Sequence, residues 1–302
     1  MTTKHVVGFS GGIDSQACAG WVLDRFPHED VILINSDAGG NEHPITTEFI
    51  RWYSAHVHPV IEITPLVRDL ADVGTKEGFG PKERRSTLNE NAPMDFADLA
   101  FVKGTFPSRK AQFCTEYLKL RPQQRWQQEN LIDPDPSVEI IRYNGVRRDE
   151  SERRKDAVER SWDTFFDCEL VRPLVSWTKA ECFAFCKARG EQINPLYTLG
   201  FSRVGCAPCV NSSKADIREW AARFPEMIEK VREWERRVGR TFFPPVVTGK
   251  KGFSRNDPTK INFIDEVVEW AKTERGGRQI SLPFVEAEAA AGTCSSKYGL
   301  CE

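Results

Sequence analysis

The chain has 302 residues, of which 40% are hydrophobic and 28% are charged, and its formal net charge is -2. This length and composition predict a globular protein with one large domain and an extension, or with two domains. The nearly balanced charge excludes a body-wide attraction to nucleic acid or membrane, so any polyanion site has to be a local patch. The sequence has no export signal and no run near the roughly 18 apolar residues of a membrane span, so we expect a cytoplasmic protein without a membrane partner.

The first part of the chain alternates between strand and helix patterns. Residues 5 to 9, 31 to 35 and 60 to 64 are short apolar runs rich in β-branched residues. Between them, the spacing of apolar residues predicts helices over 14 to 26 and over 44 to 56. This rhythm is typical of parallel strands joined by crossover helices.

The middle of the chain is less regular. Residues 68 to 113 are rich in Gly, Pro and charged residues and too long for a structureless loop, so we expect a partly helical insertion or a lid over a site. Further elements are expected as a helix over 115 to 129, strands over 138 to 143 and 169 to 175, and helices over 177 to 188 and 213 to 238. The whole predicts a doubly wound, mainly parallel, Rossmann-like α/β domain over residues 1–200, followed by a helical, cysteine-bearing region over 201–302.

A glycine-containing loop, Ser-Gly-Gly-Ile-Asp-Ser, lies between the first strand and the first helix. Gly11 and Gly12 allow a sharp turn close to a ligand, and the helix N-terminus that follows favours an anion. Ser10 and Ser15 add hydroxyl donors, while Asp14 fits a phosphate site if it orients the loop or binds a magnesium ion carried by the phosphates. The alternative is a simple glycine turn in which Asp14 caps the helix.

This loop resembles the SGGxDS loop of the PP-loop ATP pyrophosphatases. The resemblance implies an ATP-binding enzyme with an adenine nucleotide alpha hydrolase-like fold, which cleaves ATP between the α and β phosphates and activates an acceptor as an adenylate. No lysine follows the glycines as in the GxxxxGK[ST] loop of γ-phosphate transfer. AMP and pyrophosphate are therefore the expected products.

Three further stretches, 113 to 122, 144 to 154 and 194 to 209, resemble the phosphoadenylyl-sulfate (PAPS) reductase branch of these proteins. That branch also contains the sulfurtransferases of DNA phosphorothioation and uncharacterised phage and bacterial members. Reductases that take a pre-formed sulfonucleotide usually have an altered loop, so the intact loop here favours ATP.

The resemblance also suggests residues that contact the nucleotide. Lys119 and Arg147 are candidate cations for a phosphate or for charge that develops at the α-phosphate. Asp37 lies where the nucleotide base and ribose pass in the family, although a turn cap is an equal alternative. The other charges of the basic segment 147 to 155 alternate in sign, which is typical of a solvated helix start.

Two cysteine pairs indicate a metal centre. Cys206 and Cys209 form a CxxC in a Gly- and Pro-containing turn, and Cys294 and Cys301 lie in a turn-rich stretch near the end of the chain. Two thiolate pairs on loops suit a four-coordinate metal, although a CxxC also serves as a redox pair. The GCAPC stretch resembles the GCxPC of adenylyl-sulfate reductases, which implies a [4Fe-4S] cluster, with Zn2+ as the alternative.

The role of Cys114 remains open in the sequence. In those reductases the other two cluster ligands are adjacent cysteines, whereas this chain has Cys114 followed by Thr115. If the two pairs hold the metal, Cys114 is a free thiol near the crevice and a candidate sulfur carrier or nucleophile. Alternatively, Cys114 is a ligand and Cys301 is free. The remaining cysteines are expected to have structural roles: Cys18, Cys168, Cys182 and Cys186.

Three functions are consistent with these features. The first is adenylation of an acceptor (a nucleobase, DNA or a small molecule) by Mg2+-bound ATP, coupled to sulfur transfer or reduction at a metal-thiolate centre. Its expected partners are a cysteine desulfurase or a thiol electron donor, and an oligomer is compatible with the sequence. The second is a sulfonucleotide reductase that releases sulfite. The third is a nucleotide-sensing or nucleic-acid-binding module with a structural metal.

Overall fold

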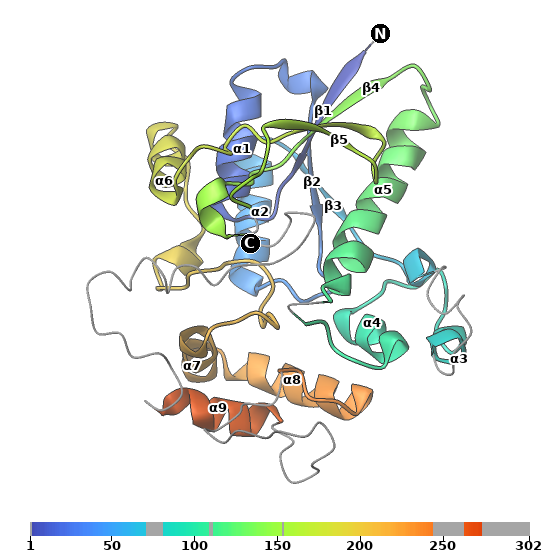
Figure 1. The fold of residues 1–302 in the computed structure, drawn as a ribbon, viewed down its shortest axis with the longest axis vertical. Coiled ribbons are helices and arrows are strands. Elements are labelled where there is room, and N and C mark those ends of the chain that lie inside the picture. Colours follow the sequence, from blue (N-terminus) through green and yellow to red (C-terminus); the bar gives the residue numbers. More distant parts are fainter. Residues whose placement is uncertain (1, 71–80, 109–110, 153, 244–262, 274–302) are drawn as a thin grey trace.

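The computed structural model describes residues 2–70, 81–108, 111–152, 154–243 and 263–273 (Figure 1). Its strands form one six-stranded sheet: β1 (Thr3–Gly8), β2 (Val31–Ser36), β3 (Val60–Ile63), β4 (Glu139–Tyr143), β5 (Arg160–Asp163) and β6 (Cys168–Val171). The described helices are α1 (Ile13–Leu23), α2 (Pro44–His56), α3 (Pro81–Ser86), α4 (Phe96–Lys103), α5 (Arg121–Gln127), α6 (Lys179–Ala188), α7 (Lys214–Arg223), α8 (Pro225–Val238) and α9 (Ile264–Lys272).

The sheet is doubly wound, as the sequence predicts. Its strand order is β3-β2-β1-β4-β6-β5, and all neighbours are parallel except β5, which is antiparallel to β6. Helices α1, α2 and α6 pack with Val7 on one face, whereas Val6 packs with the segment around α5 on the other. Because the central strands are buried on both faces, they appear in the sequence as unbroken apolar runs.

The order in which strands are added to the sheet reverses between β1 and β4, although the two strands are parallel. Strand β1 pairs with β2 on one side and with β4 on the other, and the crossover from β3 to β4 carries α5 to the opposite face. The carboxyl ends of β1 and β4 therefore border a crevice at the topological switch point.

A second core lies beyond this end of the sheet, where Figure 1 shows α4, α7, α8 and α9. In it, Phe96 of α4 packs on Trp234 of α8 with ring centroids 4.9 Å apart, and Phe242 lies 6.0 Å from each of them. One hydrophobic cluster thus joins the segment before residue 113 to the region after residue 200. The segment 68 to 113 is partly helical in its described residues, which include α3 and α4, and its role as an insertion or a lid stays a prediction. The domain boundary near residue 200 stays a prediction.

Most element bounds agree with the sequence patterns, and α2 agrees at both ends. The expected single helix over 213 to 238 is wrong, because α7 ends before Phe224 and α8 begins at Pro225. Proline lacks a backbone N–H and disfavours helical geometry at the preceding residue, and Phe224 has φ -134° and ψ 62°. The short edge strand β5 was not expected from the sequence, since Arg-Ser-Trp-Asp lacks an apolar run.

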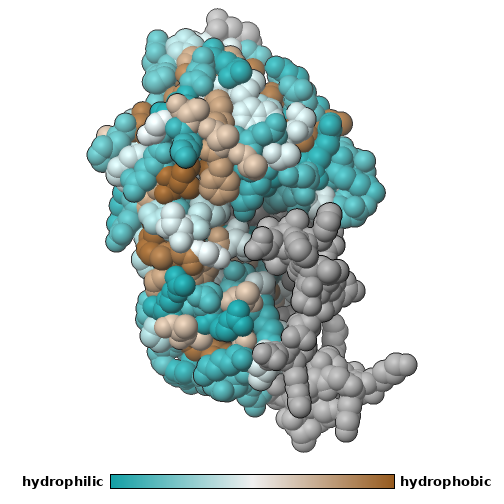
Figure 2. All heavy atoms as spheres, turned by 90° about the vertical axis from the view of Figure 1, so that its left-hand side faces the viewer, coloured by the Kyte–Doolittle hydropathy of each residue, from teal (hydrophilic) through white to brown (hydrophobic). Residues whose placement is uncertain are grey.

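The face seen in Figure 2 carries mainly hydrophilic side chains, with hydrophobic ones in small groups. Among the helices that the structure describes, none has the length and apolar character required to cross a bilayer.

Candidate functional site

A cleft with an empty volume of about 510 Å³ opens at the switch point. The cleft is lined by Gly8, Phe9, Ser10, Asp14, Ser15, Ile34, Asn35, Ser36, Lys119, Gln123, Asn144, Gly145 and Arg154. The predicted loop therefore lies at the place where open α/β sheets bind ligands.

The loop is closed by its own hydrogen bonds. The backbone N–H and the hydroxyl of Ser10 both donate to Ser15 Oγ at 3.1 Å, and the Ser15 hydroxyl donates to the Gly12 carbonyl at 2.9 Å. Gly11 has φ +77°, and a Cβ at this position would lie 3.0 Å from Thr46 Cγ2. A glycine is therefore required both by the backbone conformation and by the close approach of α2.

Two residues from the other end of the domain hold the loop in place. Asn194 Nδ2 donates to the Gly11 carbonyl at 3.1 Å, and the Tyr197 hydroxyl accepts the Ile13 N–H at 3.0 Å. Both residues lie in the stretch 194 to 209, which in the sequence shows only a family resemblance. No local pattern could have identified these contacts, because the partners are 183 and 184 residues apart.

Asp14 forms a buried ion pair with Arg147. Arg147 Nε lies 2.8 Å from Asp14 Oδ1, and the two side chains are only 4% and 3% exposed. Arg147 also pairs with Asp149 and does not line the cleft. A Cβ on Gly145 would lie 2.4 Å from the Asp14 carbonyl oxygen, so the turn after β4 packs directly on the first turn of α1. Asp14 thus couples the loop to β4, while its contact with Mg2+ and the contact of Arg147 with phosphate stay predictions.

The two cations that line the cleft are Lys119 and Arg154. Lys119 Nζ lies 3.0 Å from Glu42 Oε1. Burial alone would lower the pKa of Lys119, but Cys206 and Glu42 outweigh it and the net shift is upward, so the lysine stays charged. The sequence predicts that Arg154 belongs to a solvated helix start, because the charges around it alternate in sign. In the structure Arg154 instead pairs with Glu150 and lines the cleft.

Asp37 acts as a turn cap, the alternative that the sequence left open. Both of its carboxylate oxygens accept the Gly40 N–H at 3.0 Å. Asp37 lines a neighbouring pocket with an empty volume of about 790 Å³, which shares Asn35 with the cleft. Its contact with the nucleotide stays a prediction.

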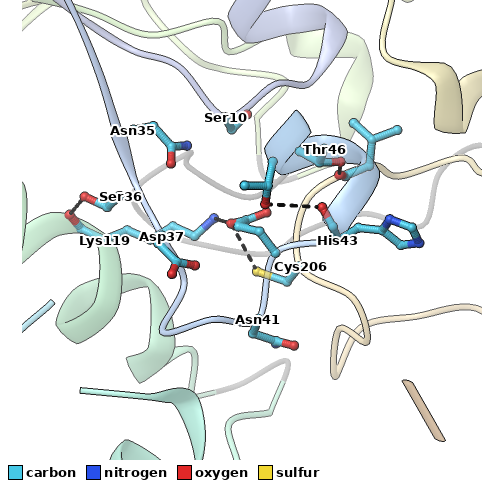
Figure 3. A network of polar contacts seen from close by, with 12 residues as sticks. Ser10, Asn35, Ser36, Asp37, Asn41, His43, Thr46, Lys119 and Cys206 are labelled. Carbon is cyan, nitrogen blue, oxygen red and sulfur yellow. Dashed lines mark hydrogen bonds and ion pairs between the residues drawn. The ribbon is translucent and has the colours of Figure 1, made fainter. Parts of the chain in front are cut away.

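The thiol-bearing loop is tied to the turn after β2. Cys206 pairs with Glu42 in an isolated antiparallel bridge, and the Ala207 N–H donates to the Asn41 carbonyl at 2.8 Å. Cys206 Sγ is 3.9 Å from Glu42 Oε1, which also binds Lys119 (Figure 3). Glu42 therefore links the thiols to the cleft, although no spacing in the sequence distinguished it.

Cys114 and Cys209 belong to the same neighbourhood. Burial raises the pKa of Cys114 to about 11, and the nearby Cys209 thiol adds to this shift. Cys209 Sγ accepts weak contacts from Arg203 Nη1 at 3.8 Å and from the Asn211 N–H at 3.4 Å. The Cys114 thiol is therefore protonated at neutral pH.

Of the four cysteines predicted to form the metal centre, Cys206 and Cys209 are among the described residues, and Cys294 and Cys301 lie outside them. In the described part of the chain, no group of three or more His, Cys, Asp or Glu side chains could hold a metal ion. A metal centre on Cys206 and Cys209 stays a prediction. The four cysteines that were expected to be structural are confirmed as buried in the cores around the sheet: Cys18, Cys168, Cys182 and Cys186.

Comparisons with known proteins agree with this architecture. Residues 4–212 match the family model described as the phosphoadenosine phosphosulfate reductase domain. The chain therefore belongs to this family, and it is an enzyme of the PAPS reductase-like type. The family resemblance deduced from the sequence is confirmed.

The relatives differ in how much of the chain they share. An uncharacterized 37.8 kDa protein in the gpa 5' region of Escherichia phage 186 is 31% identical over 100% of this chain and 97% of its own length. The adenosine 5'-phosphosulfate reductase of Allochromatium vinosum is 28% identical over 50% of this chain and 57% of the reductase. Among solved structures, the PAPS reductase of Candida auris in its phosphate complex has a TM-score of 0.43 and 15% identity, over 67% of this chain and 81% of that one.

Proposed function

We propose that this enzyme binds Mg2+-ATP in the cleft at the end of β1 and transfers AMP to an acceptor. The observation that carries the proposal is the complete Ser-Gly-Gly-Ile-Asp-Ser loop, closed by Ser10 and Ser15 and placed at the cleft. The N-terminus of α1 and the charge of Lys119 both favour an oxyanion there.

The proposed reaction is a displacement at the α-phosphorus. An acceptor oxygen forms a bond to this phosphorus, the bond to the bridging oxygen breaks, and pyrophosphate leaves with the electron pair. The acceptor proton passes to solvent. Lys119 offsets the negative charge that develops at the α-phosphate. The acceptor is a nucleobase, a DNA site or a small molecule.

We further propose a metal-thiolate centre made of Cys206, Cys209, Cys294 and Cys301, with a [4Fe-4S] cluster as the first assignment and Zn2+ as the alternative. The CxxC on a loop beside Lys119 and Cys114 supports it, although the described residues alone do not complete a donor set. Such a centre would supply sulfur-transfer or redox chemistry with sulfur or electrons from a cysteine desulfurase or a thiol donor. Protein purified without oxygen should contain iron and acid-labile sulfide, whereas stoichiometric zinc without iron would contradict the cluster.

A second candidate is a sulfonucleotide reductase. The match to the PAPS reductase domain and the similarity to adenosine 5'-phosphosulfate reductases favour it. In this reaction a cysteine thiolate attacks the sulfate sulfur, the nucleotide leaves, and a thiol donor then reduces the S-sulfonate to release sulfite. Cys114 and Cys301 are the candidate nucleophiles.

The deciding experiment is competitive binding of Mg2+-ATP, PAPS and adenylyl sulfate to protein purified without oxygen. Tighter binding of ATP, together with pyrophosphate release in the presence of an acceptor, supports adenylation. Preference for a sulfonucleotide contradicts it and supports the reductase. ATP binding without turnover for any acceptor, with loss of folding in Cys206→Ser, would instead indicate a sensing or binding module.

A further inference from the structure

A buried arginine lies directly behind the cleft. Arg142, on the central strand β4, is only 5% exposed, although this position in a parallel sheet normally holds an apolar residue. Burial lowers its pKa to about 10, so it remains charged at neutral pH. Among the described residues Asp163 raises its pKa from beyond direct contact, and a buried cation without a contacting carboxylate is costly unless its surroundings compensate.

Neutral groups surround this cation. Arg142 Nη2 donates to Gln123 Oε1 at 2.6 Å, and Nη1 donates to Gln127 Oε1 at 3.0 Å. The guanidinium carbon lies 3.6 Å from the centroid of the Phe166 ring. These hydrogen bonds use one N–H of each terminal nitrogen, and among the described residues Asp163 acts on the positive charge only from beyond direct contact.

Arg142 determines how the two glutamine side chains are oriented. A guanidinium group can only donate hydrogen bonds, so each amide must direct its oxygen toward Arg142 and its NH2 group away from it. Gln123 lines the cleft, whereas Gln127 does not and donates instead to the Phe166 carbonyl at 3.3 Å. Gln123 thus lines the same cleft as Ser10 and Lys119, with its amide oxygen held by Arg142.

We infer that Gln123 is a specificity-determining donor to an oxygen of the phosphate or sulfate group of the bound nucleotide. Arg142 is the positioning residue that fixes the amide and adds a positive charge behind it. A tetrahedral oxyanion carries only acceptor oxygens, so it matches a side chain that is held as a donor. The inference rests on the proposed function only in requiring a nucleotide in this cleft, and it applies to ATP and to a sulfonucleotide alike.

The two glutamines provide a matched test. Gln123→Glu and Gln127→Glu each place a carboxylate on Arg142 and neutralise the same buried charge, but only Gln123→Glu removes donors from the cleft. Gln123→Met and Gln127→Met form a second pair, in which each variant removes one acceptor from Arg142 and adds no charge. The probes are Mg2+-ATP, pyrophosphate and adenylyl sulfate, with adenosine as the probe that lacks an oxyanion, all followed by calorimetric titration.

Gln123→Glu should weaken binding of the oxyanion probes about tenfold or more, because a hydrogen bond to a charged group is lost and a repulsive charge is added. Gln123→Met should weaken it in the same direction by a smaller factor. Gln127→Glu should change it by about threefold at most, through the neutralised Arg142 charge alone. Adenosine binding and the thermal midpoint should be preserved in the Gln123→Glu variant.

Equal losses in the two Glu variants would overturn the donor role of Gln123, as would unchanged oxyanion binding in Gln123→Glu. A parallel loss of adenosine binding would also overturn it, since general damage to the cleft would explain both. If the wild-type protein prefers adenylyl sulfate to ATP, adenylation fails as the proposed function, and the same contrast measured with adenylyl sulfate still decides the role of Gln123.

Discussion

The loop over residues 10–15 and the thiol-bearing loop over residues 206–209 are held in different ways. The first is closed by hydrogen bonds of 3.1 Å between Ser10 and Ser15 and fixed by the buried ion pair of Asp14 with Arg147. The second is tied through its backbone to residues 41 and 42, while the sulfur atoms make only long contacts of 3.4 to 3.9 Å. The loop over residues 10–15 is thus preorganised for the proposed oxyanion, whereas a metal centre on the thiol-bearing loop stays a proposal.

The largest expected effect comes from breaking the ion pair behind the first loop. Asp14→Ala leaves Arg147 as a buried charge that retains only the partly exposed Asp149, so the free energy of unfolding should fall by about 3 to 5 kcal/mol. Urea unfolding measures this change. The double variant Asp14→Ala, Arg147→Met should recover most of the stability without restoring pyrophosphate release. A loss below about 1 kcal/mol in Asp14→Ala would mean that the pair does not hold the loop.

Crowding the same loop should have the next largest effect. In Gly145→Ala the new methyl group would lie 2.4 Å from the Asp14 carbonyl oxygen, so the turn or α1 must shift at a cost of about 3 kcal/mol. The affinity for a nucleotide should fall together with the stability. Gly190→Ala is the control, since it has φ +71° and open space around the Cβ, and it should cost about 1 kcal/mol without changing affinity.

The thiol side should be the more sensitive to acid. His43, in the turn that holds the thiol loop, is buried, and its Nδ1 accepts the Ile45 N–H at the start of α2. Burial lowers its pKa from 6.5 to about 4, with a smaller opposing effect of Glu226. Between these pH values the unfolded chain binds a proton that the folded chain does not, so stability falls as the pH falls through this window.

Protonation of His43 should lower the free energy of unfolding by about 2 to 3 kcal/mol across this pH window. His43→Asn keeps a side chain that can cap α2 and removes the titrating group, so its stability should depend less steeply on pH over the same window. Denaturant unfolding at several pH values measures the slope. Equal slopes for the variant and the wild-type protein would show that other groups cause the acid sensitivity.

The smallest effect is expected at the cysteines of the core. Cys182 is fully buried beside α1, so Cys182→Ala should lower stability by about 1 kcal/mol and leave metal content unchanged. Cys206→Ser, at the half-buried thiol beside Glu42, should lower the metal content of anaerobically purified protein. Similar metal content in the two variants would contradict the assignment of Cys206 as a ligand.

The sheet and the loop over residues 10–15 could be predicted from local sequence patterns. The middle of β1 and the first part of β2 are apolar runs because they are buried between helices, and the start of α2 is marked by Pro44. The loop is recognisable because its glycines are required by backbone geometry, which acts within a few residues. Such features depend on neighbouring residues, so the sequence by itself contains them.

Only the tertiary structure decided which polar groups meet at the cleft. Asn194 reaches Gly11, Glu42 links Lys119 to Cys206, and Arg142 orients Gln123, across separations that leave no periodic trace in the sequence. A buried polar group needs a partner, but many residues of the right type are available, and the fold selects one by position. The sequence therefore determined the sheet and its oxyanion loop, and the packing of distant segments determined which side chains complete the site.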